Sequence, residues 1–282
     1  MGFCFDLTGL TRLGSAALIS SLAVPAVLLS SAHDSQAAEF TARDVTSALH
    51  RSQTGTDEFV DADLSMLDLA NLDFKQADLT GADLYGKDLT GANLIGVNLS
   101  ETRLDRATLV RTNLSEAILD DATLLRPNLF GDLAFSPYDT ARFTNASLQR
   151  ARILGNFNGT SFRGANLTEA DFSPLRDKPD TISTLARTQL TGADFTRAVM
   201  KKVDFSQALL SFAKFTGADL SGANFRRADL SLADLSGADI AGADFTDAKL
   251  EGANLKGVKG LETAIGLTVA SSTTQQAEGN IQ

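Results

Sequence analysis

Residues 218–245 read ADLSGANFRRADLSLADLSGADIAGADF, and this stretch contains the rule that governs most of the chain. Every fifth residue in it is Leu, Ile or Phe. The same spacing runs without a break from Leu64 to Leu129 and from Leu190 to Leu255, with Met200 as one of the apolar centres. A period of five fits neither an α-helix nor a plain β-strand. The pattern therefore predicts a repeat architecture instead of an ordinary globular domain.

Each five-residue block has a small residue two positions before its apolar centre, with an Asp or Asn between them in most blocks. In extended backbone the small residue and the centre point to the same side, and the polar residue points away. The next two residues must turn the chain, and Gly is frequent there, as in Ser221-Gly222. Each block is thus one short side and one corner, which buries its apolar pair only when coils stack.

If four such sides, one from each of four blocks, close one coil, residues 20 positions apart lie directly above one another. On that register Phe205, Phe225 and Phe245 form one vertical column in the core. Lys87 is the sharpest conflict with the pattern, because it occupies a position that is elsewhere small. A buried Lys is costly unless it is paired, so we expect its coil to bulge or its amine to reach out beside Asp88.

The block spelling A-[DN]-[LF]-[ST]-x, seen at 77–81, 165–168 and 218–245, resembles the pentapeptide-repeat family. The resemblance covers about residues 60–255. It implies an all-β fold, a right-handed quadrilateral parallel β-helix, to which the residues at the two ends add a short N-terminal capping helix and a C-terminal cap. About nine coils, spaced about 4.8 Å apart, would make a solenoid about 40 Å long.

The first 37 residues read as an export signal. Arg12 precedes an apolar run that is short for a membrane-spanning helix and ends in small residues around Ala37. We therefore predict a signal peptide at 1–37 and export to a bacterial periplasm or a thylakoid lumen. Retention of this segment as a membrane anchor is the alternative.

The remaining segments follow from where the five-residue spacing starts, breaks and fades. We predict an N-terminal capping helix and lead-in at 39–58, with Thr41 as its N-cap. The β-helix spans 59–258 and is interrupted by loops at 130–142 and 173–184. Prolines lie in or beside both breaks, as expected where β-pairing stops. A C-terminal cap, with helix as one possibility, and a disordered tail make up 259–282.

Loops on a rigid scaffold often carry function. The two loops supply the candidate partner-facing residues Phe135, Tyr138, Arg176 and Lys178. The alternative is that both loops are tolerated insertions, or a hinge between two stacks of coils.

The chain shows none of the motifs of common catalytic or cofactor sites: no Cys/His cluster, G-x-S-x-G, P-loop or dinucleotide fingerprint. Its many carboxylates occupy the repeating outward position, which explains them structurally. Asp219 and Asp239, four blocks apart, could stack and attract Ca²⁺, but solvated or backbone-bonded Asp is the preferred interpretation. We predict no enzymatic activity, no catalytic residues, and no cofactor or metal.

The formal net charge is −10, and −9 without 1–37, which holds one base and two acids. This balance disfavours nucleic acid as a partner. The leading hypothesis is an exported, non-enzymatic scaffold for protein–protein interaction with an unidentified protein partner; a homodimer is also open. Membrane contact would come only through an uncleaved signal segment or a partner complex.

Two alternatives stay open. The resemblance includes the fluoroquinolone-resistance proteins, acidic members of the family that mimic DNA and bind DNA gyrase, and it implies a similar role here. The third hypothesis is a structural or assembly subunit of a larger membrane complex.

Overall fold

The computed structural model describes residues 64, 68–74, 77–130 and 140–267. The chain divides into two units, Met1–Ala37 and Ala38–Gln282, and every described residue belongs to the second. The predicted signal segment and N-terminal capping helix lie outside the described residues. Within them are two strands, β1 (Thr123–Leu125) and β2 (Arg152–Leu154), and no helix. None of the described residues forms a helix long and apolar enough to cross a membrane.

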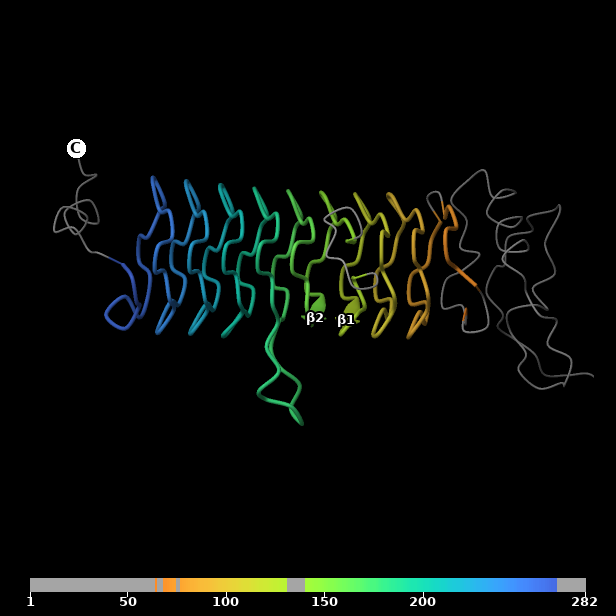
Figure 1. Cartoon of the computed structure of the whole chain (residues 1–282), viewed down its shortest axis with the longest axis horizontal. Helices are drawn as coiled ribbons and strands as arrows, with labels where there is room; N and C mark the ends of the chain where they lie inside the picture. The colour runs from red at the N-terminus through yellow and green to blue at the C-terminus, as the bar shows by residue number, and fades with distance from the viewer. Residues whose placement is uncertain (1–63, 65–67, 75–76, 131–139, 268–282) are drawn as a thin grey trace, which may run out of the picture. The chain divides into compact units, whose positions relative to one another are not determined.

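The described residues wind into stacked coils (Figure 1). Most sides pair in parallel, through a single bridge, with the side four blocks further on, as Asp219 does with Asp239. Within a coil the bridges recur once per block, so each coil has four sides. The apolar centres accordingly form four core columns, which we number from their members Phe74 (column 1), Leu79 (column 2), Leu84 (column 3) and Leu89 (column 4).

The core is filled by the predicted pair of each block, the small residue and the centre. Phe205, Phe225 and Phe245 stack in column 4 with ring centroids 5.0 and 4.9 Å apart. In column 2, Phe195 and Phe215 stack in the same way at 5.0 Å. Rings of the two columns meet edge to face across the core at about 6 Å, a geometry that aromatic pairs favour.

The small position of a block can also hold a polar side chain. Thr102 and Thr112 replace Ala at fully buried positions, and their hydroxyls donate to the carbonyl oxygens of Leu79 and Leu89, at 3.0 and 2.8 Å. A buried hydroxyl is tolerated when it is hydrogen-bonded. In β1, by contrast, the buried hydroxyl of Thr123 has no partner.

The spacing between paired residues changes in three coils. Asn113 pairs with Arg142, which lies more than four blocks further along the chain, because extra residues are inserted between columns 4 and 1. Arg142 pairs with Ser161, one position short of four blocks, because the corner at Gly155 is one residue shorter. Asn156 pairs with Thr184, again beyond four blocks, because a second insertion leaves the corner between columns 3 and 4. Pairing thus resumes at Thr184, inside the range that the sequence analysis assigned to the loop.

The corners are type II β-turns. In the block Leu79–Ala82, the N–H of Ala82 donates to the carbonyl of Leu79 at 3.0 Å, and Gly81, the third residue, has φ of 70°. Gly is not required at this third position, since 18 non-glycine residues among those described have positive φ there. We call these the left-handed corner residues. Each non-glycine residue in this conformation costs about 1–2 kcal/mol.

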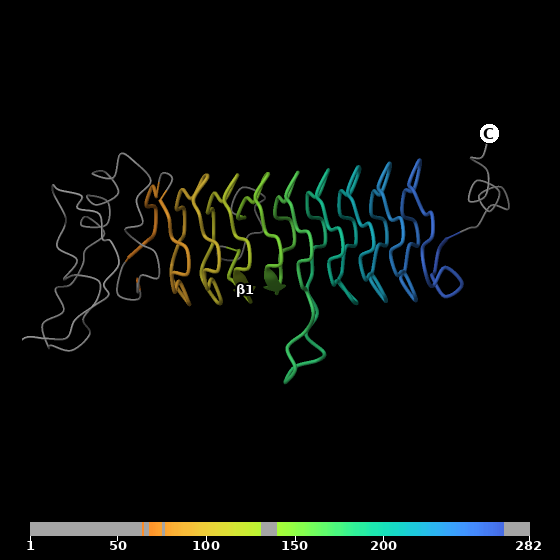
Figure 2. The same ribbon diagram turned by 180° about the vertical axis from the view of Figure 1, so that it is seen from behind.

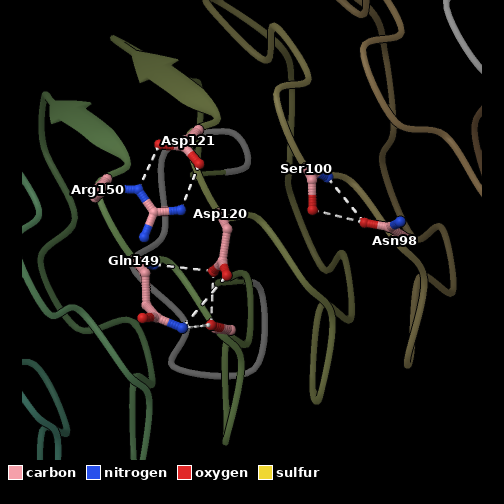
Figure 3. Close-up of polar contacts among 7 residues, drawn as sticks. Asn98, Ser100, Asp120, Asp121, Gln149 and Arg150 are labelled. Atoms are coloured by element: carbon pink, nitrogen blue, oxygen red, sulfur yellow. Dashed lines mark hydrogen bonds and ion pairs between the residues drawn. The ribbon is translucent and has the colours of Figure 1, made fainter.

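The outward Asp or Asn of a block stabilises the corner that follows it. The Asn98 side-chain oxygen accepts hydrogen bonds from the backbone N–H and hydroxyl of Ser100 at 3.1 and 2.7 Å (Figure 3). Asp194 and Asp244 accept equivalent bonds from Thr196 and Thr246. This is an Asx turn, and it explains why the block is spelled with Asp or Asn followed, two residues on, by Ser or Thr.

The structure removes one of the two alternatives for Lys87 and one possibility for the C-terminal cap. The coil of Lys87 does not bulge: Asp83 and Asp88 keep the regular four-block spacing, and the half-buried Lys87 makes the ordinary turn bond to Leu84. A lysine stem can line apolar surface, which fits this position. The C-terminal segment also shows no helix as far as Leu267; it forms a turn at 261–263, and Ile265 pairs with Asp244.

Candidate partner-binding edge

The second insertion projects from the stack as a short hairpin (Figures 1 and 2). It leaves the corner between columns 3 and 4 after Phe172 and returns at Ser183, both of which are buried. Leu175 and Lys178 form the antiparallel bridge of the hairpin, and the N–H of Lys178 donates to the Leu175 carbonyl at 3.0 Å. The loop therefore has a defined backbone.

Hydrogen bonds to the preceding coils hold the base of this hairpin. The Arg152 guanidinium donates to the carbonyl of Pro174 at 3.3 Å and lies 3.4 Å from the Asp171 carboxylate. The Arg126 guanidinium donates to the hydroxyl of Thr181 at 3.3 Å. One limb of the hairpin is thus tied by Arg152 and the other by Arg126, so its position on the corner is fixed.

Cations gather along the same corner. Arg106, Arg126 and Lys202 are left-handed corner residues on it, and Lys201 lies beside Lys202. Arg176 and Lys178 are exposed on the hairpin. We call these six residues the basic edge. Of the six, only Lys201 forms an ion pair within the described part of the chain, with Asp219 at 3.2 Å.

An aromatic residue extends the basic edge. Tyr85 lies on the same corner with 40% of its surface exposed. The Arg103 guanidinium sits over its ring, 4.1 Å from the centroid, and that of Arg106 lies at 5.8 Å. Cation–π contacts of this kind hold guanidinium groups at a surface. Acidic residues are present as well: Asp83 pairs with Arg103 at 3.2 Å, and the hairpin contains Asp177 and Asp180.

The corner between columns 2 and 3 is arranged differently, and we call it the paired corner. Here Arg150 donates to both carboxylate oxygens of Asp121, at 2.8 and 2.6 Å (Figure 3). Arg197 lies 2.7 Å from Glu169 in the coils above. The hydrogen bonds from Arg150 lower the pKa of Asp121 and raise that of Arg150. Asp121 with Arg150, and Glu169 with Arg197, therefore meet as opposite charges across neighbouring coils, whereas Glu101 and Asp121 follow each other with like charge.

The residues predicted from the sequence fall into three places. Arg176 and Lys178 lie on the exposed hairpin, whereas Phe135 and Tyr138 lie outside the described residues. Phe205, Phe225 and Phe245 are core residues. Asp219 and Asp239 pair across adjacent coils, and each accepts an Asx-turn hydrogen bond, from Ser221 and Ala241. Among the described residues no three His, Cys, Asp or Glu side chains are grouped to hold a metal ion.

Sequence reasoning missed Arg106, Arg126, Lys201 and Lys202. The first two are four blocks apart, and that spacing alone would have placed them on one corner. Lys202 is brought to the same corner only after the short corner at Gly155 and the hairpin insertion.

A family model for pentapeptide repeats matches eight copies, in residues 58–94, 88–124, 141–173, 188–227 and 218–257. These ranges cover more than half of the chain. The chain belongs to the pentapeptide-repeat family. This confirms the resemblance seen in the five-residue blocks. It also supports a repeat solenoid fold for the chain.

Solved structures of other pentapeptide-repeat proteins resemble this one. HetL, involved in regulation of heterocyst differentiation in the cyanobacterium Nostoc sp. strain PCC 7120, is 29% identical; the match covers 70% of this chain and 90% of HetL, with a TM-score of 0.43. QnrB1, a plasmid-mediated fluoroquinolone resistance protein, is 20% identical over 76% of this chain and 92% of QnrB1, with a TM-score of 0.34. A protein of the Arabidopsis thaliana thylakoid lumen is 25% identical over 60% and 69%, with a TM-score of 0.11. No curated protein matches the chain.

Pentapeptide-repeat proteins are in general non-enzymatic structural or interaction proteins. In this member of the family, the basic edge combines an inserted, fixed loop with six cations, of which only Lys201 forms an ion pair within the described residues.

Proposed function

We propose that this pentapeptide-repeat protein is an exported, non-enzymatic scaffold that binds a protein with an acidic surface along its basic edge. The observation that carries the proposal is the hairpin at 173–182, tied to the stack by Arg126 and Arg152 and flanked by the cations of the edge. A fixed projection on a rigid scaffold presents its side chains without an ordering cost at binding.

Charge order supports an acidic partner. Arg106 and Arg126 follow each other on successive coils, so their backbones are about 4.8 Å apart. Like charges this close repel, and each also carries the cost of a left-handed backbone. In a chain of net charge −10, cations kept together in this way fit a role in steering and binding an acidic surface.

The finer features of the proposal rest on the sequence. Export depends on the signal segment at 1–37, with the periplasm or the thylakoid lumen as destination. Right-handed winding, the capping helix within 39–58 and the bounds of the β-helix at 59–258 are inferred from the block pattern and the family resemblance. The basic edge disfavours the DNA-mimic hypothesis, since a mimic of DNA presents anions. The role as a subunit of a membrane complex is compatible with the same edge.

The test compares two sets of charge reversals in capture experiments from the exported fraction. One variant carries Arg106→Glu, Arg176→Glu and Lys202→Glu on the basic edge. The matched control carries Arg111→Glu, Arg187→Glu and Arg227→Glu, which reverse three exposed left-handed arginines on the corner between columns 4 and 1. Circular dichroism checks that both fold.

We expect the wild-type chain and the control to retain one acidic protein that high salt releases, and the basic-edge variant to lose at least about tenfold in affinity for it. Equal retention by all three chains, or loss from both variants alike, would contradict the assignment of the partner to this edge. A partner found only in the cytoplasm would contradict the export part of the proposal.

A further inference from the structure

The last coil of the described stack, residues 248–267, closes the core on one half only (Figures 1 and 2, blue end). In columns 3 and 4 the centre positions of this coil are Gly260 and Gly266, and the centres one coil below, Ile240 and Phe245, are buried. The turn at 261–263 bonds back to that coil, because the Thr263 hydroxyl accepts a hydrogen bond from a backbone N–H of it at 2.9 Å. Columns 3 and 4 therefore end beneath backbone, with no apolar side chain left to cover.

The other half of the coil stays apolar to its end. Columns 1 and 2 end in Leu250 and Leu255, preceded at the small positions by Ala248 and Ala253. All four residues are only partly buried, whereas the centres of the same columns one coil below are fully buried. The terminal repeat of a solenoid usually presents a polar outer face. Leu250 and Leu255 instead resemble interior centres that lack the next layer.

The backbone of this half is unpaired in the register of a further coil. One coil below, the N–H groups of Leu230, Leu232 and Leu235 donate to carbonyls of the last coil at 2.8, 2.9 and 2.9 Å. The equivalent groups of the last coil form no hydrogen bond among the described residues: they are the N–H groups of Leu250, Gly252 and Leu255 and the carbonyls of Ala248 and Ala253. Open donors and acceptors on a strand edge are a template for another strand.

The sequence after Leu267 does not spell the missing layer. If the five-residue spacing continued, Ser271 and Gln276 would stand above Leu250 and Leu255. A polar side chain at a buried position is costly without a hydrogen-bond partner, and the apolar pair of the other blocks is absent. The chemistry of the open end therefore points to a segment of another protein.

The outward residue of the last coil adds a charge preference. Lys249 is exposed on the outer face of column 1 and pairs with Asp229 of the coil below. On the outer face of column 2, Asp194, Lys214 and Asp234 follow one another on successive coils, and Lys214 lies 3.3 Å from Asp194. A carboxylate above Lys249 would repeat this order of charges, which is favourable because opposite charges stabilise neighbouring strands.

We propose that an extended segment of a partner protein adds to the open end as the next layer on columns 1 and 2, parallel to residues 248–255. Strand addition of this kind takes affinity from backbone hydrogen bonds and specificity from alternate side chains. The segment has two apolar residues five positions apart, a small residue two positions before each, and a carboxylate directly before the first apolar residue. The apolar residues cover Leu250 and Leu255, and the carboxylate meets Lys249.

The open end and the basic edge are different surfaces. The open end belongs to columns 1 and 2, whereas the basic edge lies between columns 3 and 4. Strand addition is therefore independent of the proposed acidic-partner function, and the two can fail separately. Lys249→Glu should leave capture of the acidic protein unchanged, and the triple charge reversal on the basic edge should leave strand addition unchanged.

A synthetic peptide tests recognition by the full chain in titration calorimetry. The probe is ADLSGANF, the sequence of residues 218–225, and the control ALDSGAFN exchanges its inward and outward residues. We expect the probe to bind with a dissociation constant below about 200 μM and the control at least about tenfold more weakly, since only the probe turns its apolar residues to the core. Lys249→Glu should weaken the probe about fivefold, and Lys202→Glu should not. No binding of the probe at about 1 mM, or equal binding of the control, would overturn the proposal.

Hydrogen exchange locates the added strand. With saturating probe, the amides of Leu250, Gly252 and Leu255 should exchange at least about tenfold more slowly, because a bonded N–H exchanges only after local opening. The amide of Gly257, which is also unbonded among the described residues, lies beyond the reach of an eight-residue probe and should keep its rate. Binding without protection of the first three amides would contradict strand addition at this end.

Two other occupants of the open end give different outcomes. Removal of residues 268–282 should leave the affinity for the probe unchanged; binding that appears only in the truncated chain would assign the end to the chain's own tail and refute a partner segment. Self-association in sedimentation velocity that the probe reverses would assign the end to a second copy and refute it equally.

Discussion

The paired corner and the basic edge have the same backbone and use their charges in opposite ways. On the paired corner Asp121 meets Arg150 and Glu169 meets Arg197 across neighbouring coils. On the basic edge Arg106 and Arg126 follow each other without a carboxylate partner in the described chain. The repeat therefore sets the backbone of a corner, while the left-handed corner residue can vary. From Asp121 to Arg197 the paired corner brings opposite charges together, whereas the basic edge sets Arg106 beside Arg126.

The largest expected effect tests how strictly the backbone is set. Gly155, in the shortened corner that precedes the hairpin, has φ of 150°, and an added Cβ would lie 3.2 Å from the Cα of Arg126. This backbone region is essentially limited to glycine, so Gly155→Ala should lower the free energy of unfolding by about 2–3 kcal/mol. Urea denaturation followed by circular dichroism measures the change.

Gly86→Ala on the same edge is the matched control. Gly86 has φ of 65°, and nothing lies within 4 Å of the added Cβ. It should cost only about 1 kcal/mol, since the residue adopts the left-handed region without a clash. Equal costs at the two glycines would show that the shortened corner is not a special constraint.

The next effect separates the two corners directly. Arg106→Gly and Lys202→Gly on the basic edge should each raise the free energy of unfolding by about 0.5 kcal/mol. Relief of the left-handed backbone, worth about 1–2 kcal/mol, is partly offset by the greater freedom of Gly in the unfolded chain.

Arg150→Gly on the paired corner should change stability by about zero, because the same relief is cancelled by loss of the Asp121 ion pair. The three variants are compared by thermal denaturation. If Arg150→Gly stabilised as much as Arg106→Gly, the two corners would not differ in the way their charges suggest.

The five-residue period predicts those parts of the fold that depend only on the distance between residues along the chain. It places Phe205, Phe225 and Phe245 in one column, because a multiple of the period needs no knowledge of the corners. The backbone of the corners was harder to predict. Gly was expected at the left-handed position, but the structure also has Arg, Glu and even Phe there, held by backbone hydrogen bonds that the sequence does not reveal. The sequence did not distinguish between solvated and backbone-bonded side chains for the outward Asp residues. The Asx turns show that these side chains bond to the backbone.

The basic edge could not be assembled from the sequence because its members are separated by corners of unequal length. The three irregular pairing distances depend on where each insertion leaves and rejoins a column, and on the shortened corner between them. An error of one position at Gly155 would move Lys202 away from the line of Arg106 and Arg126. Arg176 and Lys178 were found because an insertion interrupts the period visibly.

A smaller effect measures the charge order itself. In a double-mutant cycle, Asp121→Ala and Arg150→Ala should show a favourable coupling of about 0.2–1 kcal/mol that weakens as salt is added, since both side chains are about half exposed. The cycle of Arg106→Ala with Arg126→Ala should show a coupling of opposite sign and smaller size. Couplings of the same sign on the two corners would contradict the view that Asp121 and Arg150 attract each other while Arg106 and Arg126 repel.

The smallest effect concerns the carboxylates that stabilise the paired corner. The Thr80 hydroxyl lowers the pKa of Asp78. Burial opposes the shift at Asp194 and Asp234, yet hydrogen bonds, chiefly from Thr196 and Ser236, lower their pKa values as well. A pKa below the unfolded value of about 3.9 means that the fold favours the ionised form. The stabilisation is therefore complete above that value and is lost as the pH falls through the folded pKa.

Replacement of these three residues by Asn should remove this pH dependence while keeping the turns. Asn98 shows that Asn accepts the same hydrogen bonds at this position. Between pH 6 and pH 3, the wild-type chain should lose more stability than the Asp78→Asn, Asp194→Asn and Asp234→Asn triple variant, by tenths of a kcal/mol on the order expected for exposed charges. Thermal denaturation at a series of pH values gives the two slopes. Parallel slopes would mean that the acid sensitivity of the stack arises elsewhere, with the ion pairs of Asp121 and Glu169 as the next carboxylates to replace, because they belong to the same corner.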